Sequence, residues 1–334
     1  MHGACASAGK LPAAWVRRRR AWREYLAEFW GTFTILLFGA GVECQVRLHL
    51  DETGRGGVFG DYLSCRLAWA SGVALGAWVA GGISGAHINP VVTVAMALLR
   101  RFPRGKILGY MAAQVLGCVA ATFVVYGLYR DSILFWEDGA PRAVGGPRSS
   151  ADMFVTRPSS LISLPTAYAT EFVATGAMMF LVLAVSDGGH WGLPRGVMPV
   201  GLFFIVLAIG SALGFNTGYA LNPARDTGPR IALYFLGYGN ALWTHDDGYW
   251  FFGPWCSSSI GAAVGAFLYD ASLYEGTDSV LWAGGGVDES DAARGEEAPS
   301  RERTGLLEAA GGTAAAGPAH SRADARRDAG LVDV

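Results

Sequence analysis

Charged residues are scarce in this sequence. Asp, Glu, Lys and Arg make up 16% of its 334 residues, whereas they make up about 25% of a typical soluble domain. Hydrophobic residues make up 51%, and the formal net charge is only -2. The basic residues cluster at the ends of apolar runs and form no single basic face, which argues against a nucleic-acid partner. The composition therefore excludes an ordinary soluble protein and predicts several membrane spans.

Cysteine is too sparse and too scattered for a metal site or a disulfide framework. No CxxC spacing occurs, and the cysteines are odd in number and mostly lie in or beside apolar segments: Cys5, Cys44, Cys65, Cys118 and Cys256. The apolar segments also gather no set of nucleophile, base and orienting residue. The sequence therefore predicts neither an enzyme nor a bound cofactor or metal.

Long apolar runs are abundant instead. Crossing a hydrocarbon core of about 30 Å takes roughly 20 helical residues. Runs of this length lie at approximately 25–45, 62–83, 106–129, 166–186, 196–214 and 249–271. Two shorter runs, approximately 89–100 and 222–236, reach only about halfway across, and each begins at an Asn-Pro pair. These lengths predict an all-α multi-pass membrane protein with six transmembrane helices and two re-entrant half-helices.

The basic residues predict the orientation of the spans. Arg17 to Arg20 precede the first span, and Arg100 to Lys106 precede the third, which predicts that both regions are cytoplasmic. The first run is as long as a full span and is followed by others, so it is interpreted as a transmembrane helix and not as a cleaved signal peptide. The predicted organisation is a cytoplasmic basic tail at 1–23, a channel domain at 24–271 and a largely disordered C-terminal tail at 272–334, also cytoplasmic.

The chain contains an internal repeat. "YLAEFWGTFTILLFG" and "YATEFVATGAMMFLV" share Glu-Phe near the start of a span, at Glu28 and Glu171. Asn89 follows Glu28 by 61 residues, and Asn222 follows Glu171 by 51. Each half has three spans, so the second half must enter the membrane from the opposite side. This is an inverted repeat.

The two Asn-Pro pairs predict a special site at the middle of the membrane. Asn is a good N-cap, and Pro at the first helical position lacks an N–H that would be unpaired anyway. If Asn89 and Asn222 use their side-chain oxygens for capping, their amide groups remain as donors facing a lumen. The positive ends of the half-helices repel cations there. Neutral polar solutes are expected to pass, and protons and ions are not.

The sequence resembles the major intrinsic protein family, specifically its glycerol-conducting branch, the aquaglyceroporins. "GGISGAHINPVVTVA" and "TGYALNPARDTGPR" are similar to the two signature loops of the family, and the resemblance covers roughly residues 24–271. The resemblance implies an outer constriction formed by Trp69, Gly210, Tyr219 and Arg225. Water-selective members usually have His where Gly210 stands, so this glycine favours glycerol. Val91 departs from the alanine usual in the family.

The resemblance and the residues together predict further roles. Pore-lining carbonyls are expected from Gly85, Ala86 and His87. Glu28 and Glu171 are expected to accept hydrogen bonds from the backbone of the re-entrant loops, and Asp226 is expected to shape the second loop. The expected partners are glycerol and other small neutral polar solutes, water and the lipid bilayer. The resemblance implies a homotetramer, and the plasma membrane is the expected location.

Three other functions remain open from the sequence. A water-selective aquaporin has the same architecture. A secondary transporter also uses inverted repeats and broken helices, but it needs an ion or proton site at the midplane, usually acidic, where these loops offer amides and carbonyls. A non-conducting adhesion role for the same fold is the third.

Overall fold

Every regular element in the described part of the chain is a helix. The structure is a computed structural model that describes residues 12–49, 59–146, 148–276 and 279–281. The predicted all-α multi-pass fold is therefore confirmed. Most of the predicted C-terminal tail and the first 11 residues of the predicted N-terminal tail lie outside the described residues.

The helices follow the predicted order of two similar halves. The first half contains α1 (Ala13–Arg47), α2 (Tyr62–Ser84), α3 (Pro90–Leu99) and α4 (Ile107–Glu137). The second contains α5 (Leu164–Ser186), α6 (Met198–Leu213), α7 (Pro223–Leu233) and α10 (Ser258–Ser272). Short helical segments connect them: η1 (Arg104–Lys106), η2 (Ala151–Met153), η3 (Tyr234–Tyr238), α8 (Ala241–Thr244), η4 (His245–Gly248), α9 (Tyr249–Phe251) and η5 (Phe252–Ser257).

The structure differs from the predicted boundaries at the start of α1. This helix begins at Ala13, although the sequence predicts a span from about residue 25. Residues 13–23, expected to belong to the basic tail, form its first turns. Alanine and arginine favour helix, so the helix continues through the charged segment that precedes the apolar run.

The fifth and sixth predicted spans also differ in detail. Five helical stretches are long and apolar enough to cross a membrane, judged by length and composition alone. α6 has 16 residues, fewer than the roughly 20 needed, although it packs along α2 and α5 as a span does. In the last span a π-helical segment, η5, separates α9 from α10. Pro254 lies inside this segment and has no N–H for the helical ladder.

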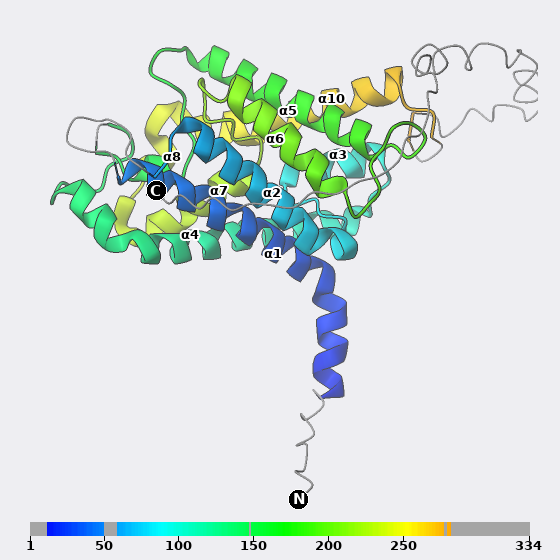
Figure 1. The fold of residues 1–334 in the computed structure, drawn as a ribbon, viewed down its shortest axis with the longest axis horizontal. Helices are drawn as coiled ribbons and strands as arrows, with labels where there is room; N and C mark the ends of the chain where they lie inside the picture. Colours follow the sequence, from blue (N-terminus) through cyan, green and yellow to red (C-terminus); the bar gives the residue numbers. More distant parts are fainter. Residues whose placement is uncertain (1–11, 50–58, 147, 277–278, 282–334) are drawn as a thin grey trace, which may run out of the picture. The chain divides into compact units, whose positions relative to one another are not determined.

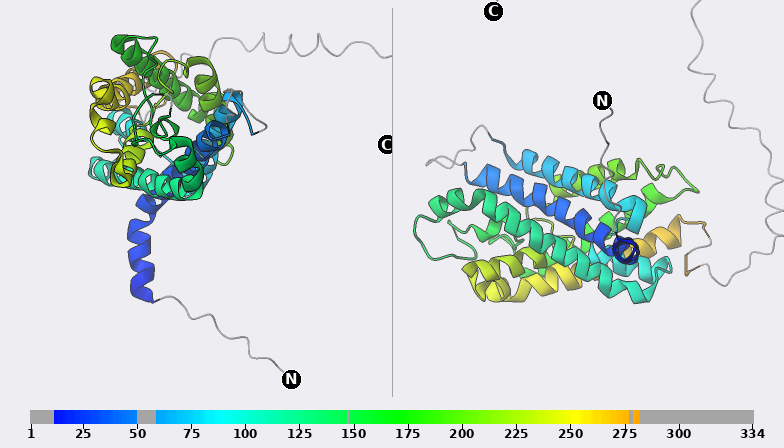
Figure 2. Two further views of the ribbon diagram at one scale, coloured as in Figure 1. Left: turned by 90° about the vertical axis from the view of Figure 1, so that its left-hand side faces the viewer. Right: turned by 90° about the horizontal axis from the view of Figure 1, so that it is seen from below.

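The packing shows how the two halves exchange their half-helices (Figures 1 and 2). α1 packs against α2 and α4 in the first half, and α5 packs against α6 and α10 in the second. α3 packs against α10 of the second half, and α7 packs against α4 of the first. Each half therefore completes its packing only with the half-helix of the other. This is the arrangement expected of an inverted repeat.

Glycine permits the closest helix contacts. A Cβ at Gly76 of α2 would lie 2.5 Å from the carbonyl oxygen of Gly31 in α1. A Cβ at Gly265 of α10 would overlap the carbonyl oxygen of Gly176 in α5. Small residues let helix backbones approach in a membrane, where lipid tails provide no hydrophobic drive for association.

Candidate pore and outer constriction

Both half-helices begin at an asparagine cap. The Oδ1 atom of Asn89 accepts a hydrogen bond from Val91 N at 3.0 Å. The Oδ1 atom of Asn222 accepts from Ala224 N at 3.0 Å and from Arg225 N at 3.3 Å. Proline occupies the first turn of each helix. The local sequence therefore fixes where α3 and α7 start.

Each asparagine cap is hydrogen-bonded to the loop that precedes the other half-helix. Nδ2 of Asn89 donates to the carbonyl of Leu221 at 2.9 Å, and Nδ2 of Asn222 donates to the carbonyl of Ile88 at 2.8 Å. The sequence predicts that these amide groups are donors facing a lumen. An amide group has two hydrogens, so one N–H of each asparagine holds the loops together and the second N–H is not used in these two bonds.

The loops before the half-helices have a strained backbone. In the first loop Gly85, Ala86 and Ile88 have φ of 88°, 52° and 43°. In the second loop Tyr219 and Leu221 have φ of 42° and 52°. Non-glycine residues in this left-handed region cost about 1–3 kcal/mol each. The loops keep this conformation only because surrounding groups hold it.

Two buried carboxylates hold these loops. Glu28 accepts hydrogen bonds from His87 N at 3.0 Å and Ile88 N at 2.6 Å. Glu171 accepts from Ala220 N at 2.9 Å and Leu221 N at 3.1 Å. Further donors complete each cage: Ser84 Oγ and Gln114 Nε2 for Glu28, and Tyr249 Oη and Ser258 Oγ for Glu171. The backbone N–H groups of these loops have no helical hydrogen-bond partner, and the two carboxylates supply acceptors for them inside the protein.

His87 and Val91 pack behind the first loop. The His87 ring lies 4.6 Å from the Phe102 ring, measured between centroids, and its Nδ1 is 3.2 Å from Thr93 Oγ1. Val91 is buried in the apolar cluster that includes Met178 and Leu221. The valine side chain is larger than the alanine that the resemblance implies at position 91, and it packs into this cluster.

Trp69 and Arg225, two of the four residues predicted to form the constriction, are in contact. The guanidinium carbon of Arg225 lies 4.5 Å from the centroid of the Trp69 ring, and both side chains are buried. Within the described residues Nη1 of Arg225 is buried and has no hydrogen-bond partner.

Gly210 and Tyr219, the other two predicted constriction residues, lie against each other. A Cβ at position 210 would lie 3.0 Å from Cζ of Tyr219 and 3.1 Å from its Cε2. Cδ of Arg66 would also lie 3.1 Å from that Cβ. The glycine therefore permits the full-sized tyrosine ring to lie against α6.

The comparisons with known proteins agree with this geometry. The pattern of the family described as "Major intrinsic protein" matches residues 15–269. The chain belongs to the major intrinsic protein family. Members of this family are membrane channels and not enzymes, so the protein is a channel, and the predicted absence of enzymatic function is confirmed.

Relatives in the family carry two kinds of name. "Aquaporin-6" of Laccaria bicolor is 39% identical over 271 residues, covering 81% of this chain and 86% of that protein. "Probable aquaglyceroporin-2" of Gibberella zeae is 42% identical over 274 residues, covering 82% of this chain and 79% of that protein. The X-ray structure of the aquaglyceroporin from Plasmodium falciparum superposes with a TM-score of 0.66 at 30% identity, covering 75% of this chain and 96% of that one.

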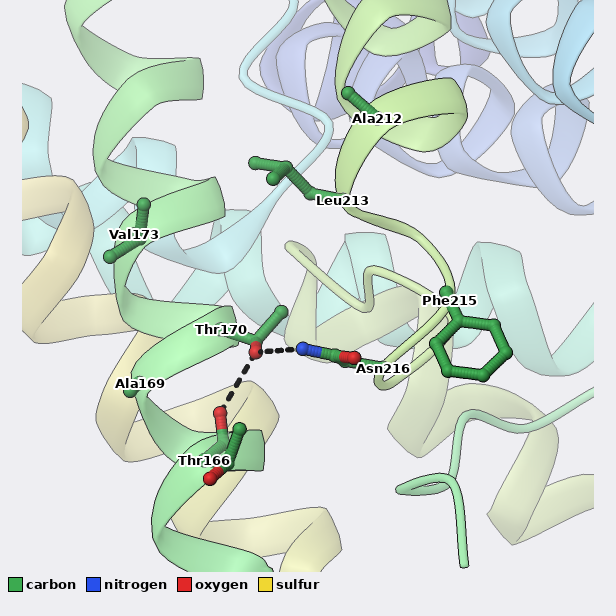
Figure 3. A pocket seen from close by; sticks show the side chains of 8 residues that line it. All are labelled: Thr166, Ala169, Thr170, Val173, Ala212, Leu213, Phe215 and Asn216. Carbon is green, nitrogen blue, oxygen red and sulfur yellow. Dashed lines mark hydrogen bonds between the residues drawn. The ribbon is translucent and has the colours of Figure 1, made fainter. Parts of the chain in front are cut away.

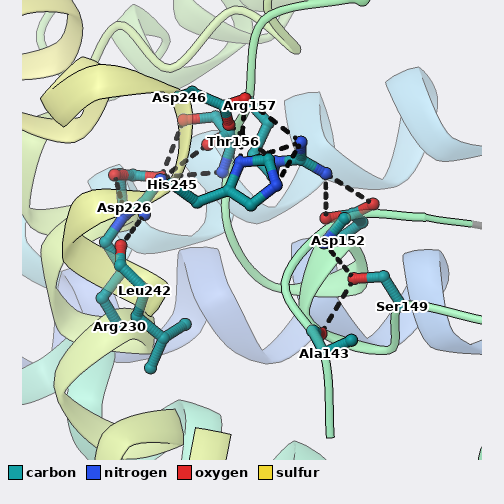
Figure 4. A network of polar contacts seen from close by, with 11 residues as sticks. Ala143, Ser149, Asp152, Thr156, Arg157, Asp226, Arg230, Leu242, His245 and Asp246 are labelled. Carbon is teal, nitrogen blue, oxygen red and sulfur yellow. Dashed lines mark hydrogen bonds and ion pairs between the residues drawn. The ribbon is translucent and has the colours of Figure 1, made fainter. Parts of the chain in front are cut away.

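Asp226 anchors the second half-helix of this family member to the segment before α5 (Figure 4). Its Oδ1 accepts from the N and Oγ1 of Thr156, both at 2.7 Å, and its Oδ2 accepts from Nε of Arg230 at 2.6 Å. Arg230 also donates to the carbonyls of Thr156 and Leu242. Asp226 and Arg230 are both buried, so the ion pair fixes the loop and does not face solvent.

Arg157 extends this network toward the surface (Figure 4). Its Nε donates to Asp246 at 2.8 Å, and its Nη1 donates to Asp152 at 3.2 Å. Burial by itself would lower the pKa of Arg157, but the carboxylates of Asp246 and Asp152 raise it above its usual value. The guanidinium therefore stays charged and links three segments of the chain.

A groove of about 320 Å³ lies between α5 and α6 (Figure 3). Its lining residues are Thr166, Ala169, Thr170, Val173, Ala212, Leu213, Phe215 and Asn216. Asn216 Nδ2 donates to Thr170 Oγ1 at 2.9 Å. None of the constriction residues lines this groove, so it is separate from the candidate pore.

Two charged residues that the sequence did not predict, Glu43 and Arg66, lie beside the predicted constriction residue Trp69. Both lie inside predicted spans, and an ionisable residue in a span indicates a functional site by default. Arg66 Nη2 donates to Glu43 Oε1 at 2.5 Å, and Trp69 Nε1 donates to the same oxygen at 3.2 Å. A search of the predicted spans 25–45 and 62–83 for ionisable residues could have identified Glu43 and Arg66 from the sequence.

Proposed function

We propose that this channel conducts glycerol, other small neutral polar solutes and water passively, and excludes protons and ions. One observation carries the choice of solute. Arg225 offers an unpartnered donor beside the face of Trp69, and Tyr219 lies against a glycine on α6. A solute with carbons along one edge and hydroxyls along the other suits such a wall. The relative and the solved structure named as aquaglyceroporins support the same choice.

The exclusion of cations is inferred from the half-helices. α3 and α7 have 10 and 11 residues, and the caps of their N-termini are joined through the two loops. Each N-terminus carries a partial positive charge, and the remaining N–H of each asparagine cap is a donor. A water or hydroxyl oxygen that accepts from both donors must point its own hydrogens away, which breaks a proton-conducting chain.

The membrane setting of the channel is part of the proposal. The termini are assigned to the cytoplasm from the basic residues near the spans, and the channel domain is assigned to 24–271, between the tails 1–23 and 272–334. We infer a homotetramer in the plasma membrane, with lipid and neighbouring copies covering apolar side chains that are exposed in the single chain. Leu108, Leu128 and Phe204 are examples.

Glycerol flux in proteoliposomes tests the choice of solute. Purified protein should raise the glycerol permeability of vesicles at least about tenfold over empty vesicles, a barrier reduction of about 1.4 kcal/mol. The measurement is stopped-flow light scattering, and the flux should not saturate or require an ion gradient. Fast water flux with glycerol permeability at the level of empty vesicles would make the protein a water-selective channel.

Proton exclusion needs a separate measurement. A pH-sensitive dye trapped in the same vesicles should report no faster acidification than in empty vesicles, because the caps and helix dipoles interrupt the water chain. The positive control is a proton carrier added to the vesicles at the end. Rapid acidification carried by the wild-type protein would contradict the proposed mechanism.

A further inference from the structure

The orientation of Trp69 depends on one hydrogen bond that its own helix does not provide. The indole N–H donates to Oε1 of Glu43 on α1 at 3.2 Å. The opposite edge of the ring packs against Gly39, where any Cβ would overlap ring atoms. Arg225 lies over the ring at 4.5 Å. Glu43 and Gly39 therefore determine, from α1, where the ring can present its face to a solute.

The carboxylate of Glu43 has a second role toward Arg66. Arg66 Nη2 donates to the same Oε1 at 2.5 Å, and its guanidinium lies between the rings of Tyr62 and Tyr219, 4.3 Å and 4.7 Å from their centroids. Arg66 is buried, and a buried arginine without a carboxylate is strongly destabilising. One carboxylate thus connects the Trp69 side of the constriction with the Tyr219 side.

We propose that Glu43 is a positioning residue of the outer constriction, which holds the Trp69 indole for solute passage and compensates the charge of Arg66. The inference rests on the proposed glycerol function. Glycerol must slide its whole carbon edge along the aromatic ring, whereas water passes without such a contact. Loss of the indole hydrogen bond therefore lowers glycerol permeability much more than water permeability.

Two double variants separate the hydrogen bond from the charge pair. Glu43→Gln with Arg66→Met removes both charges but keeps an oxygen that accepts from the indole. Glu43→Ala with Arg66→Met removes both charges and the acceptor. Neither variant leaves an unpaired buried charge, so the two are matched for the main folding risk.

The ratio of glycerol to water permeability, measured in the same proteoliposomes, is the readout. The variant with Ala at position 43 should have a ratio at least about fivefold lower than the variant with Gln, the effect of one lost hydrogen bond. Equal ratios in the two variants would overturn the proposal.

A third substitution checks the result independently. Trp69→Phe keeps an aromatic ring but removes the indole N–H. Added to both double variants, it should make their ratios agree within about twofold, because position 43 then has no indole to hold. A persistent difference would show that Glu43 acts elsewhere and would overturn the proposal.

The glycerol permeability of the wild-type protein distinguishes a failure of the proposed function from a failure of the role assigned to Glu43. If the wild-type protein fails to conduct glycerol above empty vesicles, the proposed function fails and this inference fails with it. If it conducts glycerol and the paired variants behave alike, only the role of Glu43 is wrong.

Discussion

Gly210→His should lower glycerol permeability at least about tenfold while water permeability changes less than about threefold, since each 1.36 kcal/mol of barrier is a factor of ten in rate. Even a Cβ at this position would lie 3.0 Å from the Tyr219 ring and 3.1 Å from Cδ of Arg66. An imidazole must therefore displace the tyrosine ring. Displacement of the tyrosine ring narrows the path for glycerol, which slides along the ring. Water is small enough to pass the narrowed path.

The position of the glycine allows a graded series with an internal control. Gly210→Ala should give a smaller loss of glycerol flux than Gly210→His, because a methyl group displaces Tyr219 less. Gly41 is also in a long helix, and a Cβ there meets nothing within 4 Å, so Gly41→Ala should change neither permeability. Stopped-flow measurements at matched protein incorporation give all three values. Equal losses of water and glycerol flux in Gly210→His would indicate misfolding or a selectivity site elsewhere.

Asp226→Ala should cost about 3–5 kcal/mol of unfolding free energy, the usual effect of removing one partner of a buried ion pair. The substitution leaves the guanidinium of Arg230 without its carboxylate in a site where both residues are buried. It also removes the acceptor for the N and Oγ1 of Thr156. Thermal and denaturant unfolding of the detergent-solubilised protein, followed by circular dichroism, measures the loss.

A matched exposed pair serves as the control for Asp226→Ala. Asp131 pairs with Arg130 at 3.3 Å, but its side chain is 96% exposed, so Asp131→Ala should change the unfolding free energy by less than about 0.5 kcal/mol. Adding Arg230→Met to Asp226→Ala should recover part of the stability, because it removes the uncompensated charge. Similar losses for Asp226→Ala and Asp131→Ala would contradict the role assigned to the buried pair.

The sequence alone determined the features that depend on local chemistry. The lengths of the apolar runs predicted the spans because hydrocarbon thickness sets the length of a helix. Asn89-Pro90 and Asn222-Pro223 predicted where the half-helices begin, and α3 and α7 begin there, because capping involves only neighbouring residues. The limits of this reasoning are visible in α6 and η5, where Gly214 and Pro254 end or distort helices within apolar runs.

How these elements meet depends on long-range packing. The asparagine amides bond to carbonyls more than 130 residues away, and no local pattern encodes such a partner. A Cβ at Gly210 would meet the Tyr219 ring and Cδ of Arg66, because the ring comes from a loop that packs against α6. Glu43 and Arg66 lie 23 residues apart on different helices, and their pairing with Trp69 depends on the close packing of α1 and α2. Sequence periodicity identifies which residues are apolar or charged, but the environment of a buried charge is set by the helices that surround it.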